Sequence, residues 1–474
     1  MLDLLPQLLD WWRTGERAAV ATVVRTFRSA PREPGAAMAV GPGGEVIGSV
    51  SGGCVEGAVY DVCLEVAETG RPALVRYGVS DEAAFDVGLT CGGTIELFVA
   101  PLSRAAWPDF DAFARRAIGR TTPGSDAATS THADAAAGGG VCLATVVAAP
   151  GGTTVGRHLI VLEAAPAEPG ASAGPGPRFP PGPAPAPSLG DARLGDAGLG
   201  NTELDAAGLD DAGRGNAGRG NAGRSNAGLG NTELDPAELG NTELDAAELG
   251  NTGLGNAGLD AAVAADAVGQ ITAGLSTLRE YGPHGERTGT GTQVFLQVFA
   301  PRPRLLVFGA IDFAAAMTRA GRLLGYHVTV CDARPIFTTA QRFPEADELV
   351  VDWPHRYLTA EIEAGRVSGR DAVCVLTHDP KFDVPLLRTA LTGLPAGTYV
   401  GAMGSRRAHA DREARLIDDG VPPEALARLR SPIGLDLGAR TPDETAVAIA
   451  AEMIATRSGA SARPLRETHG PIHG

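Results

Sequence analysis

Two glycine-rich segments, each with a cysteine, are the first part of the chain whose residue types could do chemistry. Cys54 follows the stretch GSVSGG, and Cys91 is followed directly by Gly92 and Gly93. Glycines let a bulky ligand contact the backbone, and a thiolate can bind a soft metal ion, carry a persulfide or act as a nucleophile. A buried structural cysteine is the usual alternative. We favour a functional role for both because each lies in a turn flanked by glycines.

A helix is predicted to begin at about Cys54, because valines recur at helical spacing from Val55 to Val66. Backbone N–H groups at a helix start attract anions, and the same partial charge favours a thiolate. Cys54 is therefore expected in the first helical turn, beside an anion-binding loop. The other cysteines lie within apolar patterns and are predicted to be core residues, namely Cys63, Cys142, Cys331 and Cys374.

A second group of residues surrounds a degraded dinucleotide-binding turn. Gly309 follows the apolar strand pattern in the stretch RLLVFGA, but Ile311 and Asp312 come next, where further glycines would admit a pyrophosphate. Asp332 lies about 20 residues further on, where an acid that binds a ribose belongs. The turn supports a Rossmann-like fold and disfavours ordinary NAD binding. A Rossmann scaffold with an empty or altered pocket is the alternative.

The motif GAMGSRR, from Gly401 to Arg407, ends another predicted strand and enters a helix. Its backbone N–H groups, the Ser405 hydroxyl and the guanidinium of Arg406 would suit a phosphate. His378 ends the preceding strand and is expected at the same carboxyl edge, where open sheets bind ligands. Solvated arginines in a plain turn, and a histidine that only hydrogen-bonds a neighbouring loop, are the alternatives.

The elements that must position these residues form two folded parts. Alternating strand and helix patterns from Arg304 to Met453 predict a doubly wound parallel sheet, with strands at 304–310, 327–332, 347–351, 371–377 and 398–402. The N-terminal part predicts an α+β domain, with strands at 18–27, 36–40, 45–50, 73–77, 94–101, 141–149, 157–162 and 292–299. The fold class is therefore α/β, with an N-terminal α+β domain and a C-terminal Rossmann-like domain.

A long insertion interrupts the first domain. Its composition shifts to Pro, Ala and Gly, and from Leu189 a five-residue repeat begins, with units such as LGDAG and LGNTE. A stacked β-helix would need an unbroken apolar ladder, so we predict disorder. A helical stretch ending near Tyr281 is expected after it. The predicted parts are the N-terminal domain at 1–163 and 261–300, the insertion at 164–260, the Rossmann-like domain at 301–458 and a tail at 459–474.

Composition narrows the class of protein. The formal net charge of −16 argues against a non-specific nucleic-acid binder. The six cysteines are spread along the chain and form neither a disulfide framework nor a zinc-like cluster. We find neither a signal-peptide pattern nor an apolar run of membrane-spanning length. The sequence therefore predicts a soluble cytoplasmic protein.

Seven segments, taken together and in order, resemble the XdhC/CoxI family. They are GSVSGGCVEGAV, GLTCGGTIELFV, RLLVFGA, VTVCDARPIFTTAQRFPEADELVV, LTHDPKFDVPLLRTAL, YVGAMGSRR and SPIGLDLGARTPDETAVAIAAEMI. The resemblance covers roughly residues 10–100 and 290–455, and it does not include the repeat insertion. One departure is the first Rossmann turn, where family members commonly have a second glycine and this chain has Ile311.

The resemblance implies an accessory factor for molybdenum hydroxylases such as xanthine dehydrogenase. Such factors bind molybdenum cofactor, in its molybdopterin or cytidine dinucleotide form, protect it while a cysteine desulfurase sulfurates it, and help insert it into the apo-enzyme. The resemblance carries over Cys54 and Cys91 as motif residues of the cofactor domain, and the GAMGSRR turn and His378-Asp379 as motif residues of the C-terminal domain. The full set of residues that we predict to bind the cofactor is Ser51, Gly52, Gly53, Cys54, Glu56, Cys91, Gly92, Gly93, Gly309, Asp332, His378, Gly401, Gly404, Ser405 and Arg406. Cys54 and Cys91 would handle molybdenum or sulfur.

Cofactor binding is predicted in preference to catalysis, and two other functions compete with it. An NAD(P)-dependent oxidoreductase would use Asp332 for the ribose and His378 as acid or base, although the degraded turn disfavours NAD(P). A non-catalytic protein would instead dock partners through the acidic repeat. The expected partners are an apo xanthine dehydrogenase or another molybdenum hydroxylase, a cysteine desulfurase and a second copy of the chain.

Overall fold

The structure of the chain is a computed structural model. The structure describes residues 1–28, 30, 32–78, 93–121, 139–151, 154–163, 253–288, 291–377 and 379–469. Cys91, Gly92 and His378 lie outside these residues, as does the predicted insertion up to residue 252. Among the helices that are described, none is both long enough and apolar enough to cross a bilayer.

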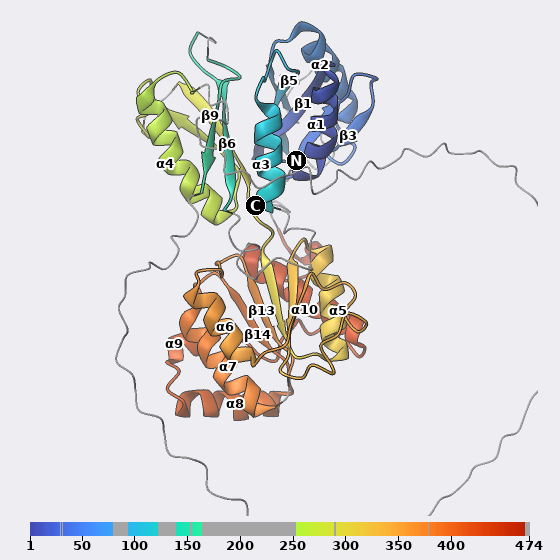
Figure 1. The fold of residues 1–474 in the computed structure, drawn as a ribbon, viewed down its shortest axis with the longest axis vertical. Helices are drawn as coiled ribbons and strands as arrows, with labels where there is room; N and C mark the ends of the chain where they lie inside the picture. The colour runs from blue at the N-terminus through green and yellow to red at the C-terminus, as the bar shows by residue number, and fades with distance from the viewer. Residues whose placement is uncertain are drawn as a thin grey trace, which may run out of the picture. The chain divides into compact units, whose positions relative to one another are not determined.

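The first sheet is antiparallel, with the strand order β3-β2-β1-β5-β4 (Figure 1). Its long central strand β1 pairs with β5 from Ala18 to Phe27. Helix α2 covers one face, where Val59, Cys63 and Val66 pack against alternate residues of β1. The elements of this part are α1 (Leu5–Thr14), β1 (Ala18–Phe27), β2 (Ala37–Val40), β3 (Val46–Gly48), α2 (Glu56–Thr69), β4 (Ala73–Tyr77), β5 (Thr94–Leu102) and α3 (Phe110–Thr121).

The second sheet joins segments from both sides of the insertion. Its order is β7-β6-β9-β8, and β9 pairs antiparallel with β6. The strands are β6 (Val141–Ala148), β7 (His158–Leu162), β8 (Thr277–Tyr281) and β9 (Thr292–Phe299), and α4 (Ala257–Ala273) packs on one face (Figure 1). The predicted helix to Tyr281 is wrong in its second half, because Gly274 ends α4 in a left-handed conformation and β8 follows.

The last units of the five-residue repeat belong to this folded part. Asn256 caps α4 by accepting a hydrogen bond from the Leu259 N–H at 2.9 Å. Leu254 and Leu259 are buried in the core between α4 and the second sheet. The predicted insertion at 164–260 is therefore too long at its C-terminal end, because residues 253–260 already contribute to the fold.

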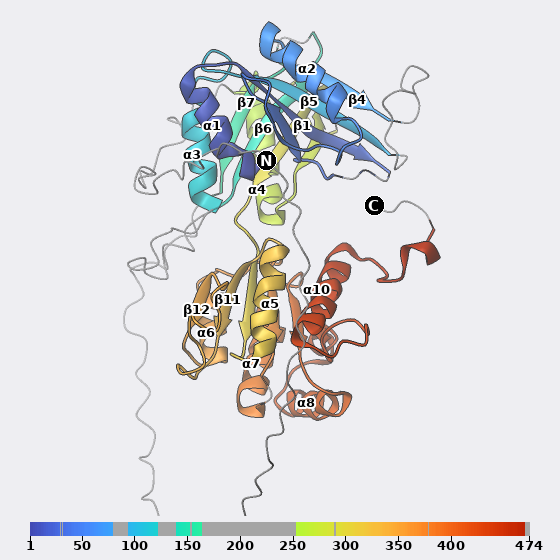
Figure 2. The same ribbon diagram turned by 90° about the vertical axis from the view of Figure 1, so that its right-hand side faces the viewer.

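The C-terminal part has the predicted doubly wound architecture. Its strands, all parallel, run in the order β12-β11-β10-β13-β14-β15, which is the 3-2-1-4-5-6 order of a Rossmann fold. Helices α5 and α10 cover one face and α6 and α7 the other (Figure 2). The strands are β10 (Arg304–Phe308), β11 (His327–Cys331), β12 (Glu348–Val350), β13 (Ala372–Val375), β14 (Tyr399–Ala402) and β15 (Leu429–Arg430).

The helices of this domain begin with residues that suit helix starts. Helix α10 starts with a capping box, in which the Thr441 side chain accepts from the Glu444 backbone N–H and the Glu444 side chain accepts from the Thr441 backbone N–H. Ser405 and Asp379 cap their helices with side-chain oxygens. The helices are α5 (Asp312–Leu323), α6 (Pro354–Glu363), α7 (Pro380–Gly393), α8 (Arg406–Asp418), α9 (Pro423–Leu426) and α10 (Pro442–Ser458).

Candidate functional site

The loop before α2 is organised around the carboxylate of Glu56. This carboxylate turns back and accepts hydrogen bonds from the backbone N–H groups of Ser51, Gly52 and Gly53, each at 2.9 Å. The hydroxyl of Ser49 donates to it at 2.8 Å, and the hydroxyl of Ser51 donates to its other oxygen. The donors of this loop therefore converge on an anion that the chain itself provides.

This geometry corrects the prediction for the helix start. Helix α2 begins at Glu56 with Val55 as its N-cap, so Cys54 precedes the helix instead of lying in its first turn. The N–H groups expected to attract an external anion already donate to Glu56 and to the Ser51 hydroxyl. Burial opposes ionisation of Glu56, but the hydrogen bonds from Ser51, Ser49 and the backbone outweigh it and lower the pKa of Glu56 to about 2.

Cys54 is the most accessible cysteine that the structure describes. It is half-buried, and its backbone N–H donates to the Ser51 hydroxyl at 3.0 Å. Gly52 and Gly53 beside it are exposed, have φ values of +78° and +118°, and face open space where a Cβ would project. The loop therefore offers the Cys54 region an open approach from solvent.

The other described cysteines are buried, which confirms their prediction as core residues. Burial raises the pKa of both Cys63 and Cys142 to about 12, and it raises the pKa of Cys331 and Cys374 as well. A thiol in such surroundings is protonated and inert at neutral pH.

The second cysteine turn is described only at its end. Gly93 is buried and directly precedes β5, while Cys91 and Gly92 lie outside the described residues. The shared role of Cys91 and Cys54 in handling molybdenum or sulfur therefore stays a prediction.

The turn between β10 and α5 is closely packed. Gly309 has a φ of +112°, and a Cβ there would lie 2.9 Å from Thr377 Cγ2 and 3.0 Å from the Thr377 backbone nitrogen. Ala310 uses both of its backbone groups, since its N–H donates to Asp332 at 2.8 Å and its carbonyl accepts from Arg342 at 3.0 Å. Gly309 is thus required by the contact with β13, whatever ligand the turn binds.

Asp332 lies at the carboxyl end of β11, as predicted for a ribose-binding acid, but its carboxylate points into the protein. Only 3% of the residue is exposed. Arg334 holds it in a bidentate ion pair, with hydrogen bonds of 2.9 and 2.8 Å from the guanidinium. Burial opposes ionisation of Asp332, yet the bonds from Arg334 and Ala310 outweigh it and lower the pKa.

The GAMGSRR motif is divided between a strand and a turn. Gly401 lies inside β14, where a Cβ would lie 2.5 Å from the Ile433 side chain, so its position is explained by packing. Gly404 has a φ of +152°, and Ser405 accepts from the Ala408 N–H at 3.1 Å as the N-cap of α8. Arg406 is exposed at the start of α8. Since β10, β11 and β14 are parallel, the structure brings Gly309, Asp332, Gly404, Ser405 and Arg406 to one edge of the sheet.

A buried ion pair beneath this edge was missed by the sequence analysis. Arg412 of α8 donates to Asp383 at 3.1 Å, to the Met403 carbonyl at 2.7 Å and to the Ser431 hydroxyl at 3.0 Å. The Thr377 hydroxyl donates to the other oxygen of Asp383. This network joins the ends of β13, β14 and β15 below the Gly404 turn. Its only sequence signal is the spacing of Arg412 four residues before the buried Leu416.

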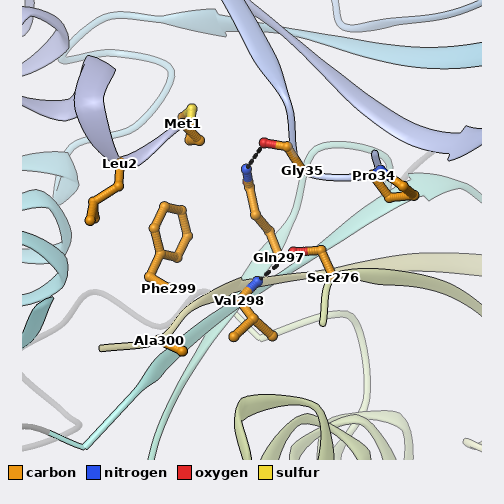
Figure 3. A pocket seen from close by; sticks show the side chains of 9 residues that line it. All are labelled: Met1, Leu2, Pro34, Gly35, Ser276, Gln297, Val298, Phe299 and Ala300. Carbon is orange, nitrogen blue, oxygen red and sulfur yellow. Dashed lines mark hydrogen bonds between the residues drawn. The ribbon is translucent and has the colours of Figure 1, made fainter. Parts of the chain in front are cut away.

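Two further observations limit where a ligand could lie. Among the described residues, no group of three His, Cys, Asp or Glu side chains could hold a metal ion. A cavity of about 220 Å³ lies beside β9 and is lined by Gly35, Gln297 and Phe299, among others (Figure 3). The Gln297 amide there donates to the Gly35 carbonyl at 3.4 Å. None of the predicted site residues lines this cavity.

Two family models match the chain, one in the region of the Cys54 loop and one in the Rossmann-like domain. The model described as XdhC and CoxI family matches residues 11–78, and the XdhC Rossmann domain matches residues 305–453. The first match includes the Cys54 loop and the second includes the whole carboxyl edge described above.

Curated relatives agree with these matches over part of their length. A probable xanthine dehydrogenase subunit of Bacillus subtilis (strain 168) is 33% identical over 175 residues, which are 37% of this chain and 48% of the relative. The molybdenum cofactor insertion chaperone PaoD of Escherichia coli (strain K12) is 41% identical over 95 residues, or 20% of this chain and 29% of the relative. The chain thus spans about half or less of the length of these relatives.

A solved structure shows the same fold. A crystal structure described as a xanthine dehydrogenase from Bacillus halodurans has a TM-score of 0.55 and 20% sequence identity, covering 98% of this chain and 97% of that one. At this identity the likeness concerns the fold alone.

Proposed function

The chain belongs, over residues 11–78 and 305–453, to the XdhC and CoxI family, and from this premise we propose that it is an accessory factor of a molybdenum hydroxylase. It binds molybdenum cofactor, supports the sulfuration of the cofactor by a cysteine desulfurase, and helps insert it into an apo-enzyme of the xanthine dehydrogenase type. The identity of 41% to a protein named as a molybdenum cofactor insertion chaperone carries this proposal.

The residues present suit such a ligand in two separate places. Molybdenum cofactor supplies, when bound, a metal centre on a dithiolene together with a phosphate group. A thiol beside exposed glycines suits the soft end of that ligand, and Cys54 has those surroundings. A capped helix start followed by an exposed cation suits the phosphate, which Ser405 and Arg406 provide.

The loop before α2 fixes the backbone next to Cys54, the residue proposed to contact the metal end of the cofactor. Because its N–H groups already bind Glu56, Cys54 is held next to a rigid loop without needing an external anion. Glu56 then shapes the loop, and this role replaces the direct cofactor contact predicted for it from the sequence.

Pterin analysis tests the proposal directly. The protein is purified from a host that makes molybdenum cofactor, then denatured and oxidised, and the extract is examined for pterin fluorescence. We expect pterin in the wild type and a loss of about tenfold in Cys54→Ser, with Glu65→Gln, at an exposed position on the helix α2 that follows the Cys54 loop, as the matched control. Absence of pterin from the wild type would refute the function. Equal pterin in Cys54→Ser and wild type would remove Cys54 from the binding step.

A further inference from the structure

The ribose-binding position of the Rossmann-like domain is already filled from within the protein. In a dinucleotide-binding domain, the acid at the end of the second strand offers its carboxylate oxygens to the ribose hydroxyls. Asp332 occupies that place directly after β11, which is the second strand of the Rossmann-like domain in chain order. Its oxygens are the acceptors that a ribose diol would need.

Both oxygens of Asp332 have two donors each. One oxygen accepts the Ala310 N–H and one guanidinium N–H of Arg334, both at 2.8 Å. The other accepts the backbone N–H and the Nε–H of Arg334, both at 2.9 Å. A carboxylate has about four acceptor positions in all, so Asp332 has none left for a ribose.

Arg334 is held in this arrangement by more than the ion pair. Its guanidinium lies 4.7 Å from the centroid of the Phe337 ring, which is within the range of a cation–π contact. Asp379, at the end of the next strand beyond β10, adds negative charge nearby; the hydrogen bond to Asp332 is the largest of the effects that raise the pKa of Arg334. The Arg334 side chain remains about half exposed, at 47%, so it forms the outer surface where a ribose would otherwise lie.

We propose that Arg334 is a specificity-determining residue that closes the ribose position of this domain and thereby excludes nucleotides bound through a free ribose diol at Asp332. The closure is independent of the altered turn at Ile311, because it concerns the ribose and not the pyrophosphate. It also holds whether or not the chain carries molybdenum cofactor. The Rossmann fold of this domain is then a scaffold for a ligand held elsewhere along the same edge.

Removing the guanidinium should reopen the position. In Arg334→Ala, the Asp332 carboxylate keeps its two backbone N–H donors and regains two acceptor positions facing solvent. Adenosine is the first probe, because it contains the diol but not the pyrophosphate that Ile311 and Asp312 would obstruct. We expect adenosine to bind Arg334→Ala at least about tenfold more tightly than the wild type, since hydrogen bonds to a charged group carry that much discrimination.

The comparison with 2′,3′-dideoxyadenosine isolates the diol. The full-length wild type, Arg334→Ala and Arg334→Gln are titrated with both nucleosides, and with NAD⁺ and NADP⁺, by isothermal calorimetry. Arg334→Ala and Arg334→Gln should both bind adenosine more tightly than the wild type does, and neither should gain affinity for dideoxyadenosine. The gain in adenosine affinity should vanish in the double variant Arg334→Ala, Asp332→Asn. Arg356→Ala removes another exposed arginine of the domain and should behave as the wild type.

Two outcomes would overturn the proposal. One is saturable binding of NAD⁺ or NADP⁺ to the wild type, which would mean that Arg334 admits a ribose or reads a ribose phosphate. The other is an equal response to adenosine and dideoxyadenosine in both Arg334 variants, with circular dichroism unchanged from the wild type. Neither result depends on pterin content, so a failure of the cofactor proposal is distinguishable from a failure of this one.

Discussion

The loop before α2 and the turn before α5 solve one problem in two ways. Each leads through a left-handed glycine into a helix, and in each a carboxylate of the chain itself accepts hydrogen bonds from the backbone. Glu56 accepts from the N–H groups of Ser51, Gly52 and Gly53 in the loop. In the turn, Asp332 accepts from the Ala310 N–H alone. In the loop the carboxylate is local, because Glu56 is the first residue of the helix that follows. In the turn it is distant in sequence, because Asp332 arrives from the neighbouring strand β11 and is fixed by Arg334.

The difference separates an open site from a closed one. Glu56 accepts the hydrogen bonds of the loop N–H groups, while Gly52 and Gly53 remain exposed and Cys54 remains partly accessible to solvent. Asp332 and the tight contact of Gly309 with β13 fill the turn instead. An internal anion therefore preserves access in the first region and removes it in the second. Four substitutions, from the largest expected effect to the smallest, test this contrast.

Gly309→Ala should have the largest effect. Its Cβ would lie 3.0 Å from the Thr377 backbone nitrogen, and its φ of +112° strains any residue with a side chain. Strain and overpacking together predict a loss of about 4 kcal/mol in the free energy of unfolding. Hydrogen exchange of the β10 amides during urea unfolding measures it in this domain alone. A loss below about 1 kcal/mol would show that β13 yields easily and that the turn is not closed by packing.

Asp332→Asn should cause the second largest loss in the free energy of unfolding. The asparagine amide would lose the ion pair with Arg334. Its NH2 group would also face N–H donors that an oxygen of Asp332 accepts from in the wild type. We expect a loss of about 2 to 3 kcal/mol, below that for a fully buried pair because Arg334 is half exposed. The same exchange experiment on the β10 and β11 amides checks it. Arg356→Ala, at an exposed position on α6, is the control and should change little.

Glu56→Gln should cost less, because the carboxylate is only partly buried. We expect about 1 to 2 kcal/mol, discounted for solvent screening, together with faster exchange of the Gly52 and Gly53 amides. Alkylation of Cys54 by iodoacetamide should also change, since the loop beside it is loosened. Glu65→Gln on the exposed face of α2 should alter neither quantity. Unchanged amide exchange in Glu56→Gln would mean that other contacts hold the loop.

The contribution of Glu56 should also depend on pH in a defined window. Its pKa is lowered in the folded state to about 2 from 4.5, so its stabilisation is fully present above pH 4.5 and is lost as the pH falls towards 2. The difference in unfolding free energy between wild type and Glu56→Gln should therefore shrink across that window and stay constant from pH 5 to 8. A difference that fell between pH 6 and 8 would contradict this assignment.

Gly52→Ala should have the smallest effect. Its Cβ would meet no atom within 4 Å, so only the φ of +78° is unfavourable. We expect a loss of about 1 kcal/mol, and the midpoint of urea unfolding measures it against Gly309→Ala. If the two substitutions cost the same, the contrast between an open loop and a packed turn would fail.

The sequence predicts the Rossmann-like strands well where apolar β-branched residues are dense. The five predicted strands agree with β10 to β14 to within a few residues. Four of them are almost wholly buried apolar runs, and β12 is the partly buried exception. The two-residue strand β15 was missed, since Leu429–Arg430 is too short to carry a pattern. Strand β8 was taken for helix because TLREY mixes charges with apolar residues and follows a helical stretch without a proline.

The sequence predicts where two of the candidate residues lie in the fold, and their role in cofactor binding stays a prediction. Asp332 and Ser405 lie at the strand ends and helix starts where their spacing puts them. The direction of a side chain depends on partners brought by the tertiary fold, and no periodicity encodes it. For this reason the sequence predicts neither the contacts of Arg334 and Arg412 nor the hydrogen bonds that Glu56 accepts within its own loop. A contact between Glu56 and the cofactor stays a prediction.

The burial of the last repeat unit in the folded domain affects how the length of the insertion can change in evolution. The segment Leu254-Gly-Asn-Ala-Gly-Leu-Asp260 forms the capped start of α4, and Asp260 secures it by accepting from the Leu254 N–H at 2.7 Å. The same pattern, Leu-Gly-Asn-x-x-Leu-Asp, occurs upstream at 199–205, 229–235 and 239–245. Unequal recombination between copies can therefore shorten or lengthen the insertion in whole units and still deliver an intact helix start to the folded domain.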